Sequence, residues 1–442
     1  MPISPARMAA FDILLRVDRQ DAYADELLHS GRLENLSRPD RGLTTELVMG
    51  VLRWRSRLDQ AIAIASERAL DKLDAEVLTA LRLAAYQLGY LNRVPAHAAI
   101  DDSVELTKRA RKRSAAPFVN AVLRKLATEQ FHSPGPTVEW RAETLASEFA
   151  HPTWLVERWV EAYGGERAEL ICRHDQRVPR TVIRVDDPAI EEELRSEGIE
   201  LAPGALVASG RVVVAGDIAH ACAFAEGRVF VQDEASQLVA LLVGTGSRLL
   251  DCCAAPGGKT AALAARNPTA QIIAAELHAH RAELLRRRLR AANVEVLQAD
   301  ALALPTAGGF DRVLADVPCS GTGTLARNPE IKWRLKSADL QDLHQRQVAI
   351  LRAALRQLAA GGRAVYSTCS LEHEECEAVV DEVLRDEAGY GLRDCRKELE
   401  QLRDSGELVW SDIDSLLTGN FLRTIPGVHP CDGFFAAILE RR

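Results

Sequence analysis

The chain has 442 residues, and its 47% hydrophobic and 27% charged residues are typical of a soluble globular protein with two or three domains. No run of about 18 apolar residues is present, which argues against a membrane-spanning helix. The N-terminus MPISPARMAAFDILL has no basic start, long apolar stretch and cleavage site, so we predict no signal peptide.

The nine cysteines lie far apart in the sequence, except for the neighbours Cys252 and Cys253. There is no CxxC pair of the kind that binds zinc, so we expect no metal site. The chain is also too long to depend on a disulfide scaffold. We therefore expect a cytoplasmic protein whose thiols stay free for packing or chemistry.

The net charge of −8 argues weakly against nucleic-acid binding, but the charges are unevenly distributed. Residues 1–135 carry 20 Lys and Arg against 17 Asp and Glu, and their basic excess is concentrated in one run. A local basic patch governs phosphate binding more than the total charge does. A solvated helix end is the alternative interpretation. The candidate RNA-binding residues are Lys108, Arg109, Arg111, Lys112 and Arg113.

Residues 1–133 are predicted to form an all-α domain. Ser4 and Pro5 are a helix start, and apolar residues then recur at helical spacing, which predicts a bundle of six or seven helices. The segment 131–136 is rich in Pro and Gly and is predicted to be a linker. Residues 140–228 are predicted to form a small α+β connector, with a helix over 154–163 and a strand over 181–185.

From residue 229 to 442 the pattern is strand and helix in alternation. Short apolar runs predict strands that begin near Leu249, Ile272, Val294, Phe310 and Ala364, with helices over 282–292 and 340–358 between them. This alternation predicts an α/β domain with a doubly wound, parallel, Rossmann-like sheet. Ligands bind beyond the carboxyl ends of the strands in such sheets, so functional residues are expected there.

A glycine-containing loop from Asp251 to Thr260 follows the first strand. A phosphate-binding loop needs a glycine five positions before Gly258, and Cys253 stands there, so that interpretation fails. Glu276 follows the second strand, where a carboxylate suits ribose hydroxyls, and Asp300 follows the third, near an expected adenine edge. Together these residues predict a site for an adenosyl-type ligand.

Two cysteines follow the fourth and fifth strands, Cys319 after Asp316-Val317-Pro318 and Cys369 after Ser367-Thr368. Free cysteine is usually a small buried hydrophobe, but both of these stand in polar loops at the expected active-site edge. Methylation of C5 of a pyrimidine needs a thiolate that adds to C6, because C5 alone is a poor nucleophile. Asp316 is placed to hydrogen-bond N3 of such a ring. The chemistry alone does not say which cysteine attacks.

These motifs resemble the Fmu/RsmB-type ribosomal RNA cytosine-C5 methyltransferases along nearly the whole chain. The family's proline–cysteine motif is matched by residues 316–323 and its second cysteine motif by residues 367–370. Residues 118–124 resemble a helical antitermination-factor (NusB-like) domain. Further segments that resemble family signatures are 232–236, 328–333 and 432–435.

The resemblance implies roles for particular residues. Cys369 is the expected nucleophile toward C6, Cys319 is expected to assist breakdown of the adduct, and Asp316 is the third catalytic residue. The expected cofactor is S-adenosyl-L-methionine, and the residues expected to bind it are Cys253, Ala254, Ala255, Pro256, Gly257, Gly258, Lys259, Glu276, Asp300 and Asp316.

The resemblance also implies the substrate, which is small-subunit (16S) rRNA, free or partly assembled. We expect the protein to act on it as a monomer. Two alternatives remain: the same chemistry on tRNA, and an RNA-binding regulator without catalysis. The NusB-like domain argues against the first, because it belongs to the rRNA branch. The intact cysteines, Asp316 and glycine loop argue against the second.

Overall fold

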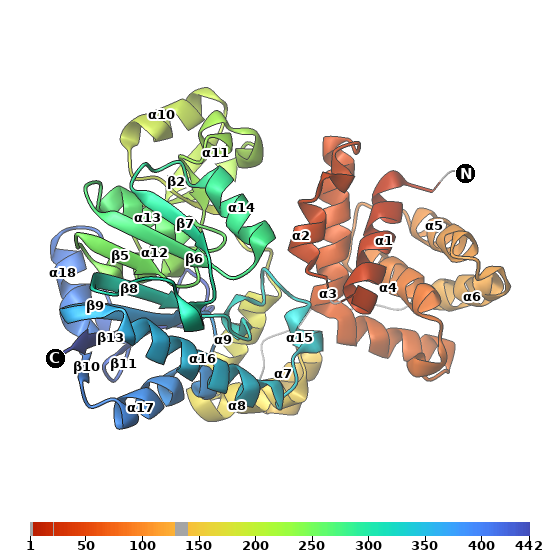
Figure 1. Cartoon of the computed structure of the whole chain (residues 1–442). Coiled ribbons are helices and arrows are strands. Elements are labelled where there is room, and N and C mark those ends of the chain that lie inside the picture. Colours follow the sequence, from red (N-terminus) through yellow and green to blue (C-terminus); the bar gives the residue numbers. More distant parts are fainter. Residues whose placement is uncertain (1–2, 21, 129–139) are drawn as a thin grey trace. The chain divides into compact units, whose positions relative to one another are not determined.

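The computed structural model describes residues 3–20, 22–128 and 140–442 (Figure 1). The linker predicted at residues 131–136 lies outside these ranges. Within them, no helix combines the length and the apolar character that crossing a membrane requires.

Contacts within the chain divide it into two units, which we describe separately. The helical unit contains Met1–Val178 and Leu325–Arg334, and the sheet unit contains Pro179–Thr324 and Leu335–Arg442. The short segment 325–334 therefore belongs to the helical unit although it follows the proline–cysteine motif in sequence. The three domain bounds given above, 1–133, 140–228 and 229–442, stay a prediction.

The helical unit follows the apolar spacing of its sequence. Helix α3 illustrates this: Ser37 caps its first turn by accepting a hydrogen bond from the backbone nitrogen of Asp40 at 3.2 Å, and Leu47 and Leu58 are buried on its inner face. The predicted α-helical N-terminal bundle is confirmed. Its helices are α1 (Pro5–Gln20), α2 (Ala24–Leu28), α3 (Arg38–Ser66), α4 (Ala75–Tyr90), α5 (Ala96–Arg109) and α6 (Ala116–Leu126).

Three further helices and one short helix complete this unit. They are α7 (Ala142–Glu148), α8 (Thr153–Tyr163), α9 (Gly165–Asp175) and α15 (Ile331–Arg334). The helix predicted over 154–163 is thus confirmed, but α7 to α9 group with the helical unit and not with the connector sheet.

The sheet unit begins with a small antiparallel sheet of strand order β2-β3-β1-β4. Ile183 and Leu194 lie in the small apolar core of this subdomain. The α+β connector is therefore present. Its elements are β1 (Val182–Arg184), α10 (Pro188–Ser196), β2 (Glu200–Pro203), β3 (Gly210–Ala215), α11 (Cys222–Ala225) and β4 (Phe230–Val231).

The main sheet has nine strands. All five predicted strands are present and run parallel, in the spatial order β7-β6-β5-β8-β9. Most apolar residues of β5, β6, β8 and β9 are buried, which explains why each of these strands appears as a short apolar run, whereas those of β7 are partly buried. These strands are β5 (Arg248–Asp251), β6 (Gln271–Glu276), β7 (Val294–Gln298), β8 (Phe310–Asp316) and β9 (Leu358–Thr368).

The predicted parallel order ends at β9, and the sheet is mixed beyond it. There β13 pairs antiparallel with β9, and both β12 and β10 pair antiparallel with β13. Four strands therefore extend the sheet at this end by antiparallel pairing. The added strands are β10 (Tyr390–Arg393), β11 (Leu417–Thr418), β12 (Phe421–Thr424) and β13 (Phe434–Arg441).

Helices cover both faces of this sheet (Figure 1). Apolar residues of α12, α13 and α18 form one core with the sheet, and those of α16 and α17 form another on the opposite face. The helix predicted over 282–292 begins and ends earlier, as α14. The helices are α12 (Glu234–Val243), α13 (Gly258–Arg266), α14 (Ala279–Arg288), α16 (Asp339–Arg356), α17 (Glu377–Asp386) and α18 (Cys395–Asp404).

Candidate active site

The predicted catalytic and cofactor residues of the sheet unit come from one edge of the sheet. Strands β5, β6 and β8 end at Asp251, Glu276 and Asp316, and β9 ends at Thr368, one residue before Cys369. Because these strands are parallel neighbours in register, their carboxyl ends meet at the same edge. The glycine loop and both cysteine loops therefore start side by side.

The glycine loop after β5 is held by a buried carboxylate. Asp251 accepts a hydrogen bond from the hydroxyl of Thr260 at 2.7 Å, and one from the backbone nitrogen of Cys253 at 3.3 Å. Burial raises the pKa of Asp251 to about 6. Gly257 has φ of 109°, a conformation that glycine adopts without strain, and α13 begins directly after it. The loop thus presents backbone rather than side chains at the start of a helix.

Glu276 and Asp300 each use one carboxylate oxygen to fix their own loop. Glu276 is buried, and its Oε1 accepts from the backbone nitrogen of His278 at 2.9 Å. Asp300 is exposed, and its Oδ1 accepts from the backbone nitrogen of Leu302 at 2.9 Å. A carboxylate has acceptor capacity beyond one such bond, so both can still bind hydroxyl or amino groups of a ligand.

Asp316 is oriented by two donors. The ammonium group of Lys259 lies 2.8 Å from its Oδ2, and the hydroxyl of Ser367 donates to its Oδ1 at 2.8 Å. Lys259 also lies 4.9 Å from the ring centroid of Phe434, which places it in cation–π contact. This arrangement joins the glycine loop to the proline–cysteine motif. Ser367 and Phe434 were not predicted as site residues, although both stand inside the motif segments 367–370 and 432–435.

The two cysteines predicted to carry the chemistry are in contact. The sulfur atoms of Cys319 and Cys369 lie 3.3 Å apart, and both residues are partly exposed. The hydrogen bond between Cys369 and Cys319, together with burial, raises the pKa of Cys369 well above its usual value. This shift favours the thiol of Cys369 over the thiolate.

Backbone hydrogen bonds fasten the two cysteine loops to each other. The nitrogen of Gly323 donates to the carbonyl of Cys369 at 2.9 Å, and the nitrogen of Gly433 donates to the carbonyl of Gly323 at 2.8 Å. A Cβ on Gly323 would lie 2.2 Å from the carbonyl oxygen of Gly433, so only glycine fits there. This close approach explains the second glycine after Cys319 and the glycine of residues 432–435.

The signature segment 328–333 belongs to the helical unit. Lys332 is buried there and donates to the carbonyls of Arg53 and Ala150, both at 3.0 Å. Trp333 donates from its indole nitrogen to the carbonyl of Leu52 at 2.7 Å. The segment therefore packs as part of the helical core.

The predicted RNA-binding run lies at the end of α5 and in the turn after it. Four of its five residues are exposed, and Lys112 is partly buried. Lys108 pairs with Glu105 at 2.6 Å and Lys112 with Asp74 at 2.9 Å, which reduces the positive charge they offer to phosphate. The assignment of this run to RNA stays a prediction.

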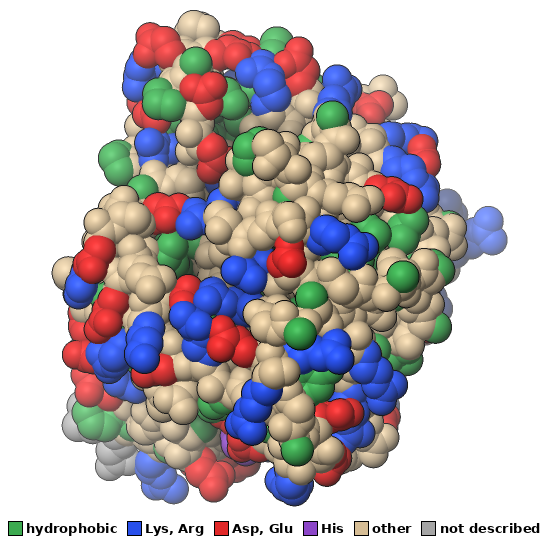
Figure 2. All heavy atoms as spheres, turned by 60° about the vertical axis from the view of Figure 1, so that its left-hand side comes forward, with side chains coloured by type: hydrophobic (Ala, Val, Ile, Leu, Met, Phe, Trp, Pro, Cys, Tyr) green, Lys and Arg blue, Asp and Glu red, His purple; other side chains and the backbone are tan. Residues whose placement is uncertain are grey.

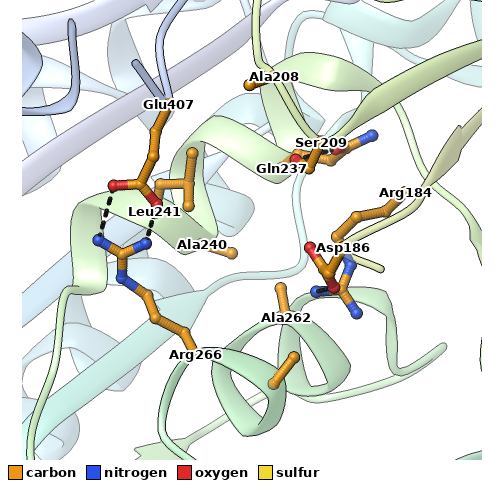
Figure 3. Close-up of a pocket in the computed structure, with 11 residues that line it drawn as sticks. Arg184, Asp186, Ala208, Ser209, Gln237, Ala240, Leu241, Ala262, Arg266 and Glu407 are labelled. Atoms are coloured by element: carbon orange, nitrogen blue, oxygen red, sulfur yellow. Dashed lines mark hydrogen bonds and ion pairs between the residues drawn. The ribbon is translucent and has the colours of Figure 1, made fainter. Parts of the chain in front are cut away.

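A pocket of about 190 Å³ lies elsewhere in the sheet unit, and none of the predicted catalytic or cofactor residues lines it (Figure 3). Two ion pairs line this pocket. Arg184 pairs with Asp186 at 2.6 Å, and Arg266 pairs with Glu407. Figure 2 likewise shows basic and acidic side chains intermingled over the face that it turns forward. Because each arginine already has a carboxylate partner, the pocket offers no excess charge to a phosphate.

Comparison with known proteins agrees with this geometry. Residues 239–440 match the family model described as 16S rRNA methyltransferase RsmB/F, residues 4–128 match the NusB family, and residues 151–215 match the ferredoxin-like domain of RsmF/B-like methyltransferases.

Curated relatives cover most or all of the chain. The probable ribosomal RNA small subunit methyltransferase B of Bacillus subtilis is 34% identical over 100% of both chains. The ribosomal RNA small subunit methyltransferase B of Pseudomonas syringae is 34% identical over 87% of each chain. Among solved structures, a methyltransferase homolog protein from Pyrococcus horikoshii shares the fold with a TM-score of 0.56 at 23% identity, over 70% of this chain and 100% of that one.

Proposed function

Since this chain belongs to the 16S rRNA methyltransferase RsmB/F family, we propose that it methylates C5 of a cytosine in 16S rRNA. The observation that carries the proposal is the contact of 3.3 Å between the sulfurs of Cys319 and Cys369 at the strand ends, beside Asp316. Methylation of an oxygen or an exocyclic nitrogen needs no thiol, whereas C5 chemistry needs one to attack and benefits from a second group at release.

The residues of this edge suit S-adenosylmethionine as the methyl donor. A Cβ on Gly257 would lie 2.8 Å from a methyl carbon of Leu285, so this turn requires glycine, and without a side chain its backbone can be approached closely by a ligand. Glu276 and Asp300 retain acceptor capacity for ribose hydroxyls and for an adenine amino group. When bound, this cofactor supplies an electrophilic methyl group.

In the proposed reaction Cys369 gives up its proton to Asp316, and its sulfur bonds to C6 of the cytosine. The electrons of the C5–C6 double bond then make C5 nucleophilic, while Asp316, now a carboxylic acid, donates a hydrogen bond to N3, where negative charge develops. After methylation the C5 proton leaves to a base and the C6–sulfur bond breaks, which regenerates Cys369. Cys319, in contact with that sulfur, assists this release. The family resemblance, and not the chemistry alone, assigns the two cysteines in this order.

The target cytosine must leave its base stack to meet Cys369, as in other enzymes that modify bases. Extrusion is easiest from a loop or an unpaired segment, where RNA recognition by proteins is concentrated. We therefore propose that the substrate is free or partly assembled small-subunit rRNA in which such a segment is accessible.

The test is to incubate Cys319→Ala with unmodified 16S rRNA and S-adenosylmethionine labelled in the methyl group, followed by a denaturing gel. The expected result is a labelled protein–RNA adduct that is absent from the double variant Cys319→Ala/Cys369→Ala. Cys222→Ala, at an exposed cysteine of the connector, is the matched control and should give labelled RNA without an adduct. Label in free RNA but no adduct with Cys319→Ala would overturn the assigned role of Cys319, and no label with the wild type would overturn the proposed substrate.

A further inference from the structure

The residue after each cysteine faces a different environment from the cysteine itself. Cys319 and Cys369 are partly exposed, but Ser320 and Ser370 are buried. Their hydroxyl oxygens lie 3.1 Å apart, so the two serines meet in the interior as the two sulfurs meet at the edge. The spacing of the sulfurs therefore depends on what holds the serines.

What holds the serines is the fully buried carboxylate of Glu375. Its Oε1 accepts from the backbone nitrogen of Ser320 and from the side-chain nitrogen of Gln347, each at 2.8 Å. Its Oε2 accepts from the hydroxyl of Ser320 and, at 2.5 Å, from that of Ser370. One carboxylate thus binds the loop of each cysteine, and its four donors are all neutral groups.

Glu375 is itself held in place from two directions. The hydroxyl of Tyr366, on β9, donates to the carbonyl of Glu375 at 2.6 Å. Gln347, on α16, donates to the carbonyl of Pro318 at 3.0 Å as well as to the carboxylate. Because Pro318 precedes Cys319, these bonds fix the cysteine loop on both sides of the sulfur.

We infer that Glu375 is a positioning residue that sets the spacing of the two thiols by binding the residue after each cysteine. This inference rests on the proposed function for its kinetic consequence, because a misplacement of about 1 Å at reacting atoms lowers a rate by about 10²-fold. The spacing of the two thiols can itself be measured without RNA.

Substitution by alanine and by glutamine separates positioning from charge. Glu375→Ala removes all four acceptor contacts and leaves buried donors unpaired. Glu375→Gln keeps an acceptor oxygen for Ser320 and Gln347, and its amide nitrogen replaces the other oxygen. Because hydroxyls rotate and can accept as well as donate, Ser320 and Ser370 can bind that nitrogen. The glutamine variant is therefore expected to restore the network.

The first experiment measures kcat and KM for 16S rRNA. Glu375→Ala is expected to lower kcat about 10²-fold with KM unchanged, and Glu375→Gln is expected to stay within a few-fold of the wild type. Glu374→Gln, at the adjacent and partly exposed carboxylate, is the matched control and should leave both constants unchanged. If Glu375→Ala does not fold, Ser370→Ala replaces it. This change removes one of the four donors to Glu375, together with the contacts of the Ser370 hydroxyl to Ser320 and to the backbone nitrogen of Glu372, and a smaller loss of kcat is expected.

The second experiment uses phenylarsine oxide, which condenses with two neighbouring thiols and releases one water. Protection of Cys319 and Cys369 from iodoacetamide is measured by peptide mass spectrometry. Phenylarsine oxide should protect the two cysteines in the wild type, in Glu375→Gln and in Glu374→Gln. Glu375→Ala should need at least about ten times more phenylarsine oxide for the same protection, a ratio that corresponds to about 1.4 kcal/mol.

Normal capture by folded Glu375→Ala, or loss of capture in Glu375→Gln equal to that in Glu375→Ala, would overturn the inference. If the wild type captures the arsenical and the variants follow the expected order, but no 5-methylcytosine forms in 16S rRNA, the proposed function fails while the positioning role stands.

Discussion

Each of the two units buries a charged side chain from a motif segment, and the two burials differ in their partners. In the helical unit Lys332 donates to two backbone carbonyls, and burial lowers its pKa from 10.5 to about 7. In the sheet unit Glu375 receives four donors, two of them from the residue after Cys319. A buried charged side chain therefore affects the chemistry only where its hydrogen-bond partners adjoin reacting atoms. Substitutions around Glu375 should change catalysis, whereas substitutions around Lys332 should change stability.

The largest effect is expected at the thiol that the sheet unit presents. Cys369→Ala should lower methyl transfer to 16S rRNA by roughly 10³-fold or more, because the covalent route is lost. The side chain is small and partly exposed, so the thermal unfolding midpoint should change little. Methyl incorporation and calorimetry on the same preparation check this, with Cys222→Ala as the control. An active Cys369→Ala protein would assign the attack to another residue.

A smaller loss is expected when the charge next to the thiols is removed. Asp316→Asn should lower kcat by about 10²-fold, because the ring nitrogen loses its partner and Lys259 loses its ion pair. Asp342→Asn on the exposed side of α16 is the control and should retain full activity. Equal kcat values for the two variants would show that Asp316 has no part in the chemistry.

The parts of the fold that could be predicted from the sequence are those with a local signal. The strands beginning near Leu249 and Phe310 are short apolar runs next to turn residues, and parallel order brings their ends together. The cysteine loops and the glycine loop follow from that topology. For this reason the sequence alone indicates that these loops meet at one edge of the sheet, while the roles of their residues stay a prediction.

The buried charges had no local signal. Glu375 stands in His373-Glu374-Glu375-Cys376, which is typical of an exposed turn, and its partners Ser320 and Gln347 are 55 and 28 residues away. Lys332 is bound by carbonyls 279 and 182 residues away. Strand β13 was missed for the same reason, since its place between β9 and β12 depends on pairing across the chain. Long-range contacts decide these features, and spacing in the sequence does not encode them.

The contact between the two sulfurs makes a prediction about pH. Because the hydrogen bond between the Cys369 thiol and Cys319 is the first cause that raises the pKa of Cys369, Cys319→Ala should lower that pKa and increase the thiolate fraction near neutral pH. Peptide mass spectrometry can follow the alkylation of Cys369 by iodoacetamide at a series of pH values. As the pH is raised, the alkylation rate should begin to increase at a lower pH in the variant than in the wild type. An unchanged profile would mean that burial alone controls this thiol.

In the helical unit the expected readout is stability and not turnover. Between pH 7 and 10.5 the unfolded chain binds a proton at Lys332 that the folded chain lacks, so the free energy of unfolding rises with pH across this window and is constant below it for this group. In Lys332→Met the free energy of unfolding should lose this dependence on pH, whose slope is at most about 1.4 kcal/mol per pH unit. Urea unfolding from pH 7 to 9 checks this, with the exposed Lys336→Met as the control. A slope that persists in Lys332→Met would contradict the lowered pKa.

The smallest effect is expected for charges on the surface of the helical unit. Lys108 and Lys112 pair with carboxylates, whereas no ion pair is found for Arg111 or Arg113 within the described residues 3–20, 22–128 and 140–442. If this run binds RNA phosphates, Arg111→Ala and Arg113→Ala should each reduce the slope of log affinity against log salt by about 1. Lys108→Ala should change it less, because Glu105 already offsets that charge. Filter binding of 16S rRNA at several salt concentrations measures the slopes, and equal, unchanged slopes in all three variants would place the RNA on another surface.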